Sequence, residues 1–423
     1  MLHFGNFRFA YKQLIKKSEA ELDEIMKDYI ALPEAKRNAF KDRPAKSVSI
    51  KEIDRDKTWY TGYIAPRVIK READHVSKLL ENGASAFNLP DSEFEDLVPL
   101  GEMYKEMDAD REQKARQAIK NTDIYLTWDY MDVYVATSMR ARWEFEETAD
   151  FITSLFDRPQ LKPLKLRWFD PTQSLCADRI DKGLIEGLMI KRAYCTVYMA
   201  QETDTMGKDS ELAATLAQGK PVIAYVPFID KDKHALKIKT YPLDYFKIRS
   251  LILQAEGMFE DEKCKPELQA YDPNFEETIN EFHEELAEYR KKQPFSLWQE
   301  KEDKFKDQIK EVFERMYRIL TIAEFHNFEK RARTLREIHP LALQVDLKTG
   351  VTNGVLVVRN VEDCAGLLHR ILINSLTFTI KHIVKGASGI TVLEEDISRC
   401  PFRAVTDYEK LTNSFWNFYL VTP

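Results

Sequence analysis

The sequence predicts an α/β fold with a parallel sheet in the middle of the chain. A mostly helical N-terminal region and an α+β C-terminal region are expected on either side. Between about residues 131 and 228, short β-branched and aromatic runs alternate with amphipathic segments of helical length. Strands that alternate with helices in this way form βαβ units, so they pair in parallel through right-handed crossovers.

The predicted strands and helices of this central region follow one another closely. The strands are expected at 132–137, 164–169, 194–200 and 221–226, and the helices at 144–156, 178–192 and 211–218. The first strand reads Asp-Val-Tyr-Val-Ala-Thr, which is typical of a strand buried on both faces. Gly219 stands where a glycine commonly ends a helix.

The pattern divides the chain into three regions, at 1–130, 131–272 and 273–423. In the first region we expect helices at 9–32, 69–82 and 103–121. In the third, the charged and helix-favouring segment 276–337 could form a helical hairpin or a dimer-forming helix. Beyond it we expect strands at 342–347 and 354–359, a hairpin being one arrangement, then a helical or mixed segment at 364–383 and a strand at 415–421.

Composition limits the classes of function. The chain has 423 residues and a net charge of −7, which argues against broad nucleic-acid binding. The five cysteines form no CxxC pair, as expected of reduced thiols in the cytoplasm. No apolar run of 18 residues occurs, so no membrane partner is expected. The scattered histidines predict no metal site, and the P-loop, GxGxxG, HExxH and GxSxG motifs are missing.

Polar side chains gather where the predicted strands end. Ligands of open parallel sheets bind at the loops beyond the carboxyl ends of the strands. Arg140 could grip a phosphate with its planar guanidinium, although an exposed arginine near a helix start is the more ordinary interpretation. The candidate substrate-binding residues at these ends are Thr137, Ser138, Arg140, Asp170, Asp204, Gly207 and Ser210.

Glu211 is the candidate catalytic residue. It is expected in the first turn of its helix, where the helix dipole favours a carboxylate and Ser210 or Asp209 can cap the backbone amides. An acidic first turn is also a common stabilising feature, so this simpler interpretation stays open.

Residues 209–223, DSELAATLAQGKPVI, resemble the active-site helix of the nucleoside 2-deoxyribosyltransferase-like proteins. They also resemble the related arrangement in TIR domains. In the first family a catalytic glutamate precedes Gly-Lys-Pro-Val by eight residues, as Glu211 does here. Residues 178–185, DRIDKGLI, resemble that family's Asp-bearing helix, with Asp181 as the match. The resemblance covers less than a quarter of the chain and implies a flavodoxin-like or TIR-like fold.

The resemblance implies cleavage of an N-glycosidic bond in NAD, a nucleoside or a nucleotide. A carboxylate beside C1′ stabilises the oxocarbenium character of the transition state, or attacks to give a glycosyl enzyme. Asp181 and Asp209 are then the candidates for a second acid. No cofactor is expected, since NAD would be a substrate. Such domains joined to large accessory regions often act as antiviral defence effectors, which is the cellular role implied here.

Two other functions remain open from the sequence. The central region could be a non-catalytic nucleotide-binding, signalling or scaffold module, in which the acidic helix start is only a cap. Alternatively, the chain could be an assembly protein that forms homo-oligomers through its C-terminal helices. For the enzyme and for the nucleotide-binding module, the expected partner is a small nucleotide or nucleoside.

Overall fold

The computed structural model describes residues 113, 115–128, 130–139, 142–176, 179–202, 206–218, 220–240, 245–292, 310–338, 344–346, 351–353, 355–373, 375–385 and 388–405. The helices expected at 9–32 and 69–82 and the strand expected at 415–421 lie outside these residues. Residues 115–127 are helical and lead into the first strand, which agrees with the later part of the helix expected at 103–121.

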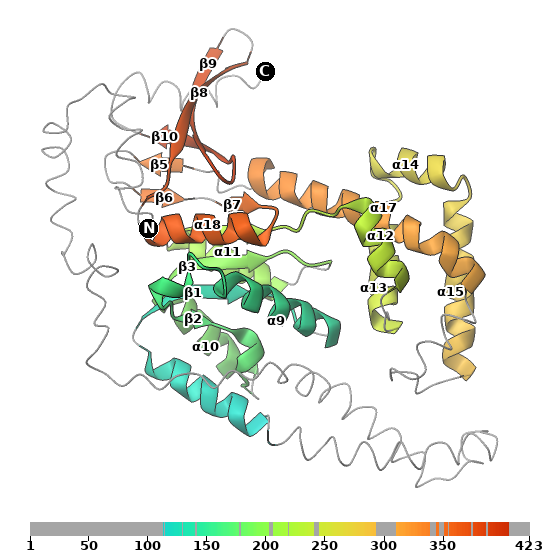
Figure 1. Cartoon of the computed structure of the whole chain (residues 1–423), viewed down its shortest axis with the longest axis horizontal. Helices are drawn as coiled ribbons and strands as arrows, with labels where there is room; N and C mark the ends of the chain where they lie inside the picture. Colours follow the sequence, from blue (N-terminus) through green and yellow to red (C-terminus); the bar gives the residue numbers. More distant parts are fainter. Residues whose placement is uncertain are drawn as a thin grey trace, which may run out of the picture.

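The described core is a five-stranded parallel sheet, which confirms the predicted α/β class (Figure 1). Its order is β2-β1-β3-β4-β7, with bounds Trp168–Phe169, Met131–Ala136, Ala193–Met199, Val222–Tyr225 and Val355–Val358. Every residue of β1 is buried, as expected of a strand covered on both faces. Val133 pairs with Cys195, and Thr196 with Val222, so the carboxyl ends of β1, β3 and β4 lie at the same edge.

Two pairs of helices cover the two faces of this sheet. Alternate side chains of a strand point to opposite faces. Tyr134 of β1 reaches α11, Met206–Ala217, which packs beside α10, Arg179–Arg192. On the other face, Phe151 of α9, Arg142–Phe156, stacks on Tyr225 with ring centroids 4.4 Å apart. Helix α18, Val361–Leu372, packs against α9 and β4.

The fifth strand comes from far along the chain. The run expected as a strand at 354–359, in the C-terminal region, forms β7 and pairs with β4. Because α18 follows β7 directly and covers the sheet, the α/β unit continues well beyond residue 272. The strand expected at 342–347 corresponds to β5, Gln344–Asp346. It forms its antiparallel pair with β6, Val351–Asn353, and not with the run at 354–359.

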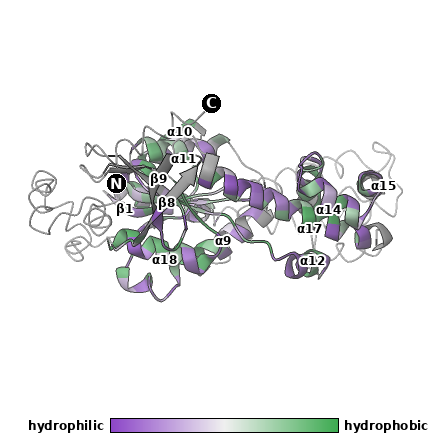
Figure 2. Cartoon of the chain, turned by 90° about the horizontal axis from the view of Figure 1, so that it is seen from above, coloured by the Kyte–Doolittle hydropathy of each residue, from purple (hydrophilic) through white to green (hydrophobic). Residues whose placement is uncertain are grey.

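Among the described residues, five α-helices between β4 and β7 form a separate helical arm (Figures 1 and 2). They are α12 Lys231–Thr240, α13 Tyr245–Glu256, α14 Cys264–Tyr271, α15 Phe275–Lys292 and α17 Lys310–Arg333. Ile252, Phe282 and Met316 lie in the arm's own apolar core. Phe328 and Ala332, near the end of α17, belong to the core of the sheet. Helix α17 therefore joins the arm to the sheet.

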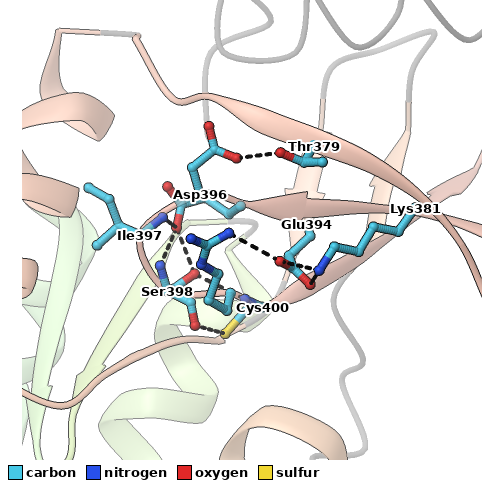
Figure 3. Close-up of polar contacts among 9 residues, drawn as sticks. Thr379, Lys381, Glu394, Asp396, Ile397, Ser398 and Cys400 are labelled. Carbon is cyan, nitrogen blue, oxygen red and sulfur yellow. Dashed lines mark hydrogen bonds and ion pairs between the residues drawn. The ribbon is translucent and has the colours of Figure 1, made fainter.

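A second, mixed sheet has the order β6-β5-β10-β9-β8. Strands β8, Phe378–Lys385, and β9, Ser388–Glu395, form an antiparallel pair, and β10, Pro401–Val405, follows a tight turn. Figure 3 shows polar contacts around this turn, among them Lys381 Nζ to Glu394 Oε2 at 2.6 Å. Thr379 Oγ1 donates to Asp396 Oδ1 at 2.9 Å. The first contact joins β8 to β9, and the second links the turn after β9 to β8.

Among the helices that the structure describes, none is both long and apolar enough to cross a bilayer.

Candidate functional site

Helix α11 begins earlier than the sequence pattern predicts. It starts at Met206, so Glu211 lies in the second turn and the expectation of a first-turn position is wrong. Lys208, in the polar run before Glu211, is buried against β3: its Nζ donates to the Met199 carbonyl at 3.0 Å and lies 4.8 Å from the ring centroid of Tyr198. Ser210 Oγ donates to the Met206 carbonyl at 2.7 Å. Capping of the helix start therefore does not explain Glu211.

The carboxyl group of Glu211 is held by a tyrosine from the neighbouring sheet. Tyr134 Oη donates to Glu211 Oε1 at 3.0 Å. Tyr134 is buried on β1 and stacks on Phe169, with ring centroids 5.2 Å apart, so its hydroxyl is fixed in direction. Glu211 Oε2 is buried and has no hydrogen-bond partner in the part of the chain that the structure describes. Within the described residues, one buried carboxyl oxygen of Glu211 is thus left without a hydrogen bond.

The surroundings of Glu211 favour its protonated form. Burial raises its pKa to about 8, the charge of Glu186 adds to the rise, and the Tyr134 hydrogen bond opposes it. Burial also raises the pKa of Glu186, against the effect of Lys182. Lys182 Nζ lies 3.5 Å from Glu186 Oε1 on the same helix. The result is an electrostatically coupled pair of carboxyl groups, one on α10 and one on α11.

Glu186 was not among the candidates from the sequence. Its only sequence signal is the spacing of four residues from Lys182, which is common on exposed helix faces. Asp181, the expected second acid, is exposed in the first turn of α10. Which acid faces Glu211 depends on how α10 packs against α11, and the sequence of one helix does not contain that information.

Asp209, the other expected acid, is also held by a tyrosine. It is exposed at the start of α11, and Tyr198 Oη donates to its Oδ1 at 3.1 Å. Burial raises the pKa of Tyr198, with further contributions from Asp209 and Glu211, while Arg331 lowers it. Tyrosines of the adjacent strands β1 and β3 therefore hold Glu211 and Asp209, two residues apart on one helix.

The loops after β1 and β3 are joined by one glutamine. The Ser138 backbone N–H donates to Gln201 Oε1 at 2.6 Å, and Gln201 Nε2 donates back to the Ser138 carbonyl at 2.9 Å. Arg331 of α17 donates to the Gln201 carbonyl. Thr137 Oγ1 is buried and has no hydrogen-bond partner among the described residues. The helical arm thus reaches the edge of the sheet where the site lies.

The other expected substrate-binding residues have mixed positions. Asp170 is buried and caps a short 3-10 helix, accepting from Thr172 N at 2.9 Å and Thr172 Oγ1 at 2.6 Å. Gly207 and Ser210 are exposed in the first turns of α11. Arg140 and Asp204 lie outside the described residues.

The described residues contain no group of three histidine, cysteine, aspartate or glutamate side chains placed to hold a metal ion. Comparison of the chain with known protein families, with curated proteins and with solved structures gave no match. The resemblance of residues 209–223 to the deoxyribosyltransferase-like and TIR families is therefore supported by the motif alone.

Proposed function

We propose that the chain cleaves the N-glycosidic bond of a nucleoside or nucleotide, NAD included, and that Glu211 is the acting carboxyl group. The observation that carries the proposal is the state of Glu211, whose Oε1 is held by a buried tyrosine while Oε2 is buried with no hydrogen bond from a described residue. Strongly perturbed carboxyl groups of this kind are concentrated at catalytic sites.

The chemistry requires a carboxyl group at a fixed position beside the sugar. Breaking the bond from C1′ to the base nitrogen places positive charge on C1′ and the ring oxygen. An ionised carboxylate stabilises that charge, and a protonated one can donate to the departing base. The hydroxyl of Tyr134 restricts the rotation of Glu211, which is what such positioning needs.

The cellular role is proposed from the resemblance of residues 209–223 alone. An enzyme that destroys a nucleotide pool in the cytoplasm suits an antiviral effector, and its activity would then need control by the rest of the chain. The contact of Arg331 with Gln201 offers a physical connection between the helical arm and the sheet edge. Assembly into homo-oligomers through the helices of this arm is one way to supply such control.

A second candidate is a non-catalytic module that binds a nucleotide. With the pKa of Glu211 raised to about 8, its carboxyl group is mostly uncharged at neutral pH. An uncharged carboxyl can bind a base edge through one donor and one acceptor without any reaction.

The test is a substrate screen. Purified wild-type chain is incubated with NAD and with a panel of nucleosides and nucleotides, and the released base is separated by chromatography. Glu211→Gln is the test variant, and Glu362→Gln, an exposed glutamate of α18, is the matched control. Release by wild type and control but not by Glu211→Gln is expected. Equal release by Glu211→Gln contradicts the proposal, and binding without release supports the second candidate.

A further inference from the structure

We propose that Glu211 and Glu186, on the packed helices α11 and α10, form a carboxyl pair from which Glu211 delivers a proton to the departing base. This inference rests on the proposed function and narrows its substrate class. A base that leaves as an anion needs a proton, as purines and pyrimidines of nucleosides and nucleotides do. The pyridinium of NAD leaves as neutral nicotinamide and needs none. The preferred substrate is therefore a nucleoside or nucleotide with a neutral base.

The hydrogen bonds around Glu211 carry this inference. In the described part of the chain, its only side-chain hydrogen-bond donor is the neutral hydroxyl of Tyr134. The nearby ammonium groups are engaged elsewhere: Lys208 donates to the Met199 carbonyl, and Lys182 pairs with Glu186. The charges of Lys182 and Lys208 only partly offset the burial of Glu211, and a buried carboxylate with a single neutral donor favours uptake of a proton.

The charged and titratable groups that face Glu211 come from each element around it. Tyr134 of β1 hydrogen-bonds to it, Glu186 and Lys182 of α10 act on its charge, Tyr198 of β3 is coupled to it, and Lys208 lies on its own helix. Their balance leaves the pKa of Glu211 at about 8. At pH 7 the protonated form then exceeds the ionised form about tenfold. Burial raises the pKa of Glu186, but Lys182 Nζ, 3.5 Å from its Oε1, opposes that rise, so we assign the negative charge of the pair to Glu186.

The proposed reaction balances with water as the second reactant. The bond from C1′ to the base nitrogen breaks and both of its electrons go to the base, which takes the proton from Glu211. The negative charges of Glu186 and of the newly ionised Glu211 stabilise the glycosyl cation. Water then adds at C1′ and returns one proton to Glu211. The products are the free base and the free sugar or sugar phosphate.

The pair can be tested without a substrate, by infrared titration of protonated carboxyl groups in the full chain. The difference between wild type and Glu211→Gln should contain one carboxylic acid band that is lost as the pH rises through about 8. Glu186→Gln should move this loss to lower pH because repulsion is removed, and Lys182→Met should move it to higher pH. The opposite signs separate an electrostatic effect from general unfolding, and Glu362→Gln should change nothing.

The substrate class is tested by the pH dependence of base release. Cleavage of a neutral-base nucleoside should fall as the pH rises through about 8, because Glu211 loses its proton. If no band is lost near that pH, the carboxyl pair is contradicted whatever the substrate. If the band is present but only NAD is cleaved, faster at higher pH, the acid role is overturned while glycosidic cleavage stands. If the band is present and no substrate is cleaved, the proposed function fails and the acid role fails with it.

Discussion

Two glutamates of this molecule, Glu211 and Glu395, each have one carboxyl oxygen shielded from water, but Glu395 is fully buried, Glu211 is only partly buried, and their surroundings differ. Burial raises the pKa of both, and in each case one carboxyl oxygen is buried with no hydrogen-bond partner among the described residues. The other oxygen of Glu395 accepts from Ile397 N at 3.1 Å, Ser398 N at 2.6 Å and Ser398 Oγ at 2.7 Å. The other oxygen of Glu211 accepts from one tyrosine that is 77 residues away in sequence.

The difference shows which buried acids are candidates for chemistry. The donors to Glu395 are Ile397 and Ser398, two and three residues after it. Both lie in the turn between β9 and β10, where Cys400 Sγ also contacts the Ser398 carbonyl (Figure 3). They stabilise that turn, as local side-chain to backbone bonds usually do. The groups around Glu211 come from other elements, and they include a second acid that raises the pKa further. Such an arrangement costs stability without supporting any local structure, which points to function.

The largest expected effect is the loss of stability in Glu395→Ala. This change leaves the buried donors of Ser398 without their acceptor, so we expect a cost of about 3 kcal/mol in the free energy of unfolding. Glu211→Gln should cost little at neutral pH, because glutamine resembles the protonated acid. Denaturant unfolding of the two variants measures the contrast. A larger loss of unfolding free energy in Glu211→Gln than in Glu395→Ala would mean that Glu211, and not Glu395, stabilises the fold.

The second expected effect is a dependence of stability on pH. Because the folded-state pKa of Glu211 lies at about 8 and the ordinary value is 4.5, the folded chain binds more protons between these limits. Stability should therefore fall as the pH rises through this window, by up to about 1.4 kcal/mol per pH unit. The measurement is the difference between wild type and Glu211→Gln across the window, which cancels the contribution of Glu395. Parallel curves for the two proteins would refute the raised pKa.

A smaller effect is expected from Tyr134→Phe. Removing the hydroxyl leaves Glu211 Oε1 without its donor, at a cost of about 1 kcal/mol, and the pKa of Glu211 should rise further. Base release should slow about tenfold, since the carboxyl group is no longer fixed. Tyr225→Phe is the matched control, because Tyr225 lies at the other face of the sheet, where it stacks on Phe151. Similar slowing in both variants would argue against a special role for Tyr134.

The smallest effect is expected from Arg331→Gln. Losing the contact with the Gln201 carbonyl should weaken the connection of α17 to the sheet edge by roughly 1 kcal/mol. Faster hydrogen exchange is then expected in peptides that cover Ser138 and Gln201. Arg333→Gln, an exposed position on the same helix, should leave that exchange unchanged. Unchanged exchange in Arg331→Gln as well would show that the arm does not stabilise these loops.

The sequence alone was sufficient to predict the strands β1, β3 and β4, because their apolar runs are bounded by polar residues and alternate with helices. It was not sufficient to predict that β7 pairs with β4, because the whole helical arm lies between these two strands in the sequence. It also placed the start of α11 too late, because the polar run before Glu211 looks like a loop unless the burial of Lys208 is known. Glu211 could be selected from its motif, whereas Glu186 could not, since only the packing of α10 against α11 couples the two acids.

The most direct test of the central claim is base release by wild type, Glu211→Gln and Glu395→Ala, measured side by side on one neutral-base nucleoside at pH 7 and at a temperature where all three are folded. The account predicts that Glu395→Ala keeps most of the activity and that Glu211→Gln loses about a hundredfold or more. Full activity of Glu211→Gln, or equal losses in both variants, would contradict the assignment of Glu211 as the acting carboxyl group.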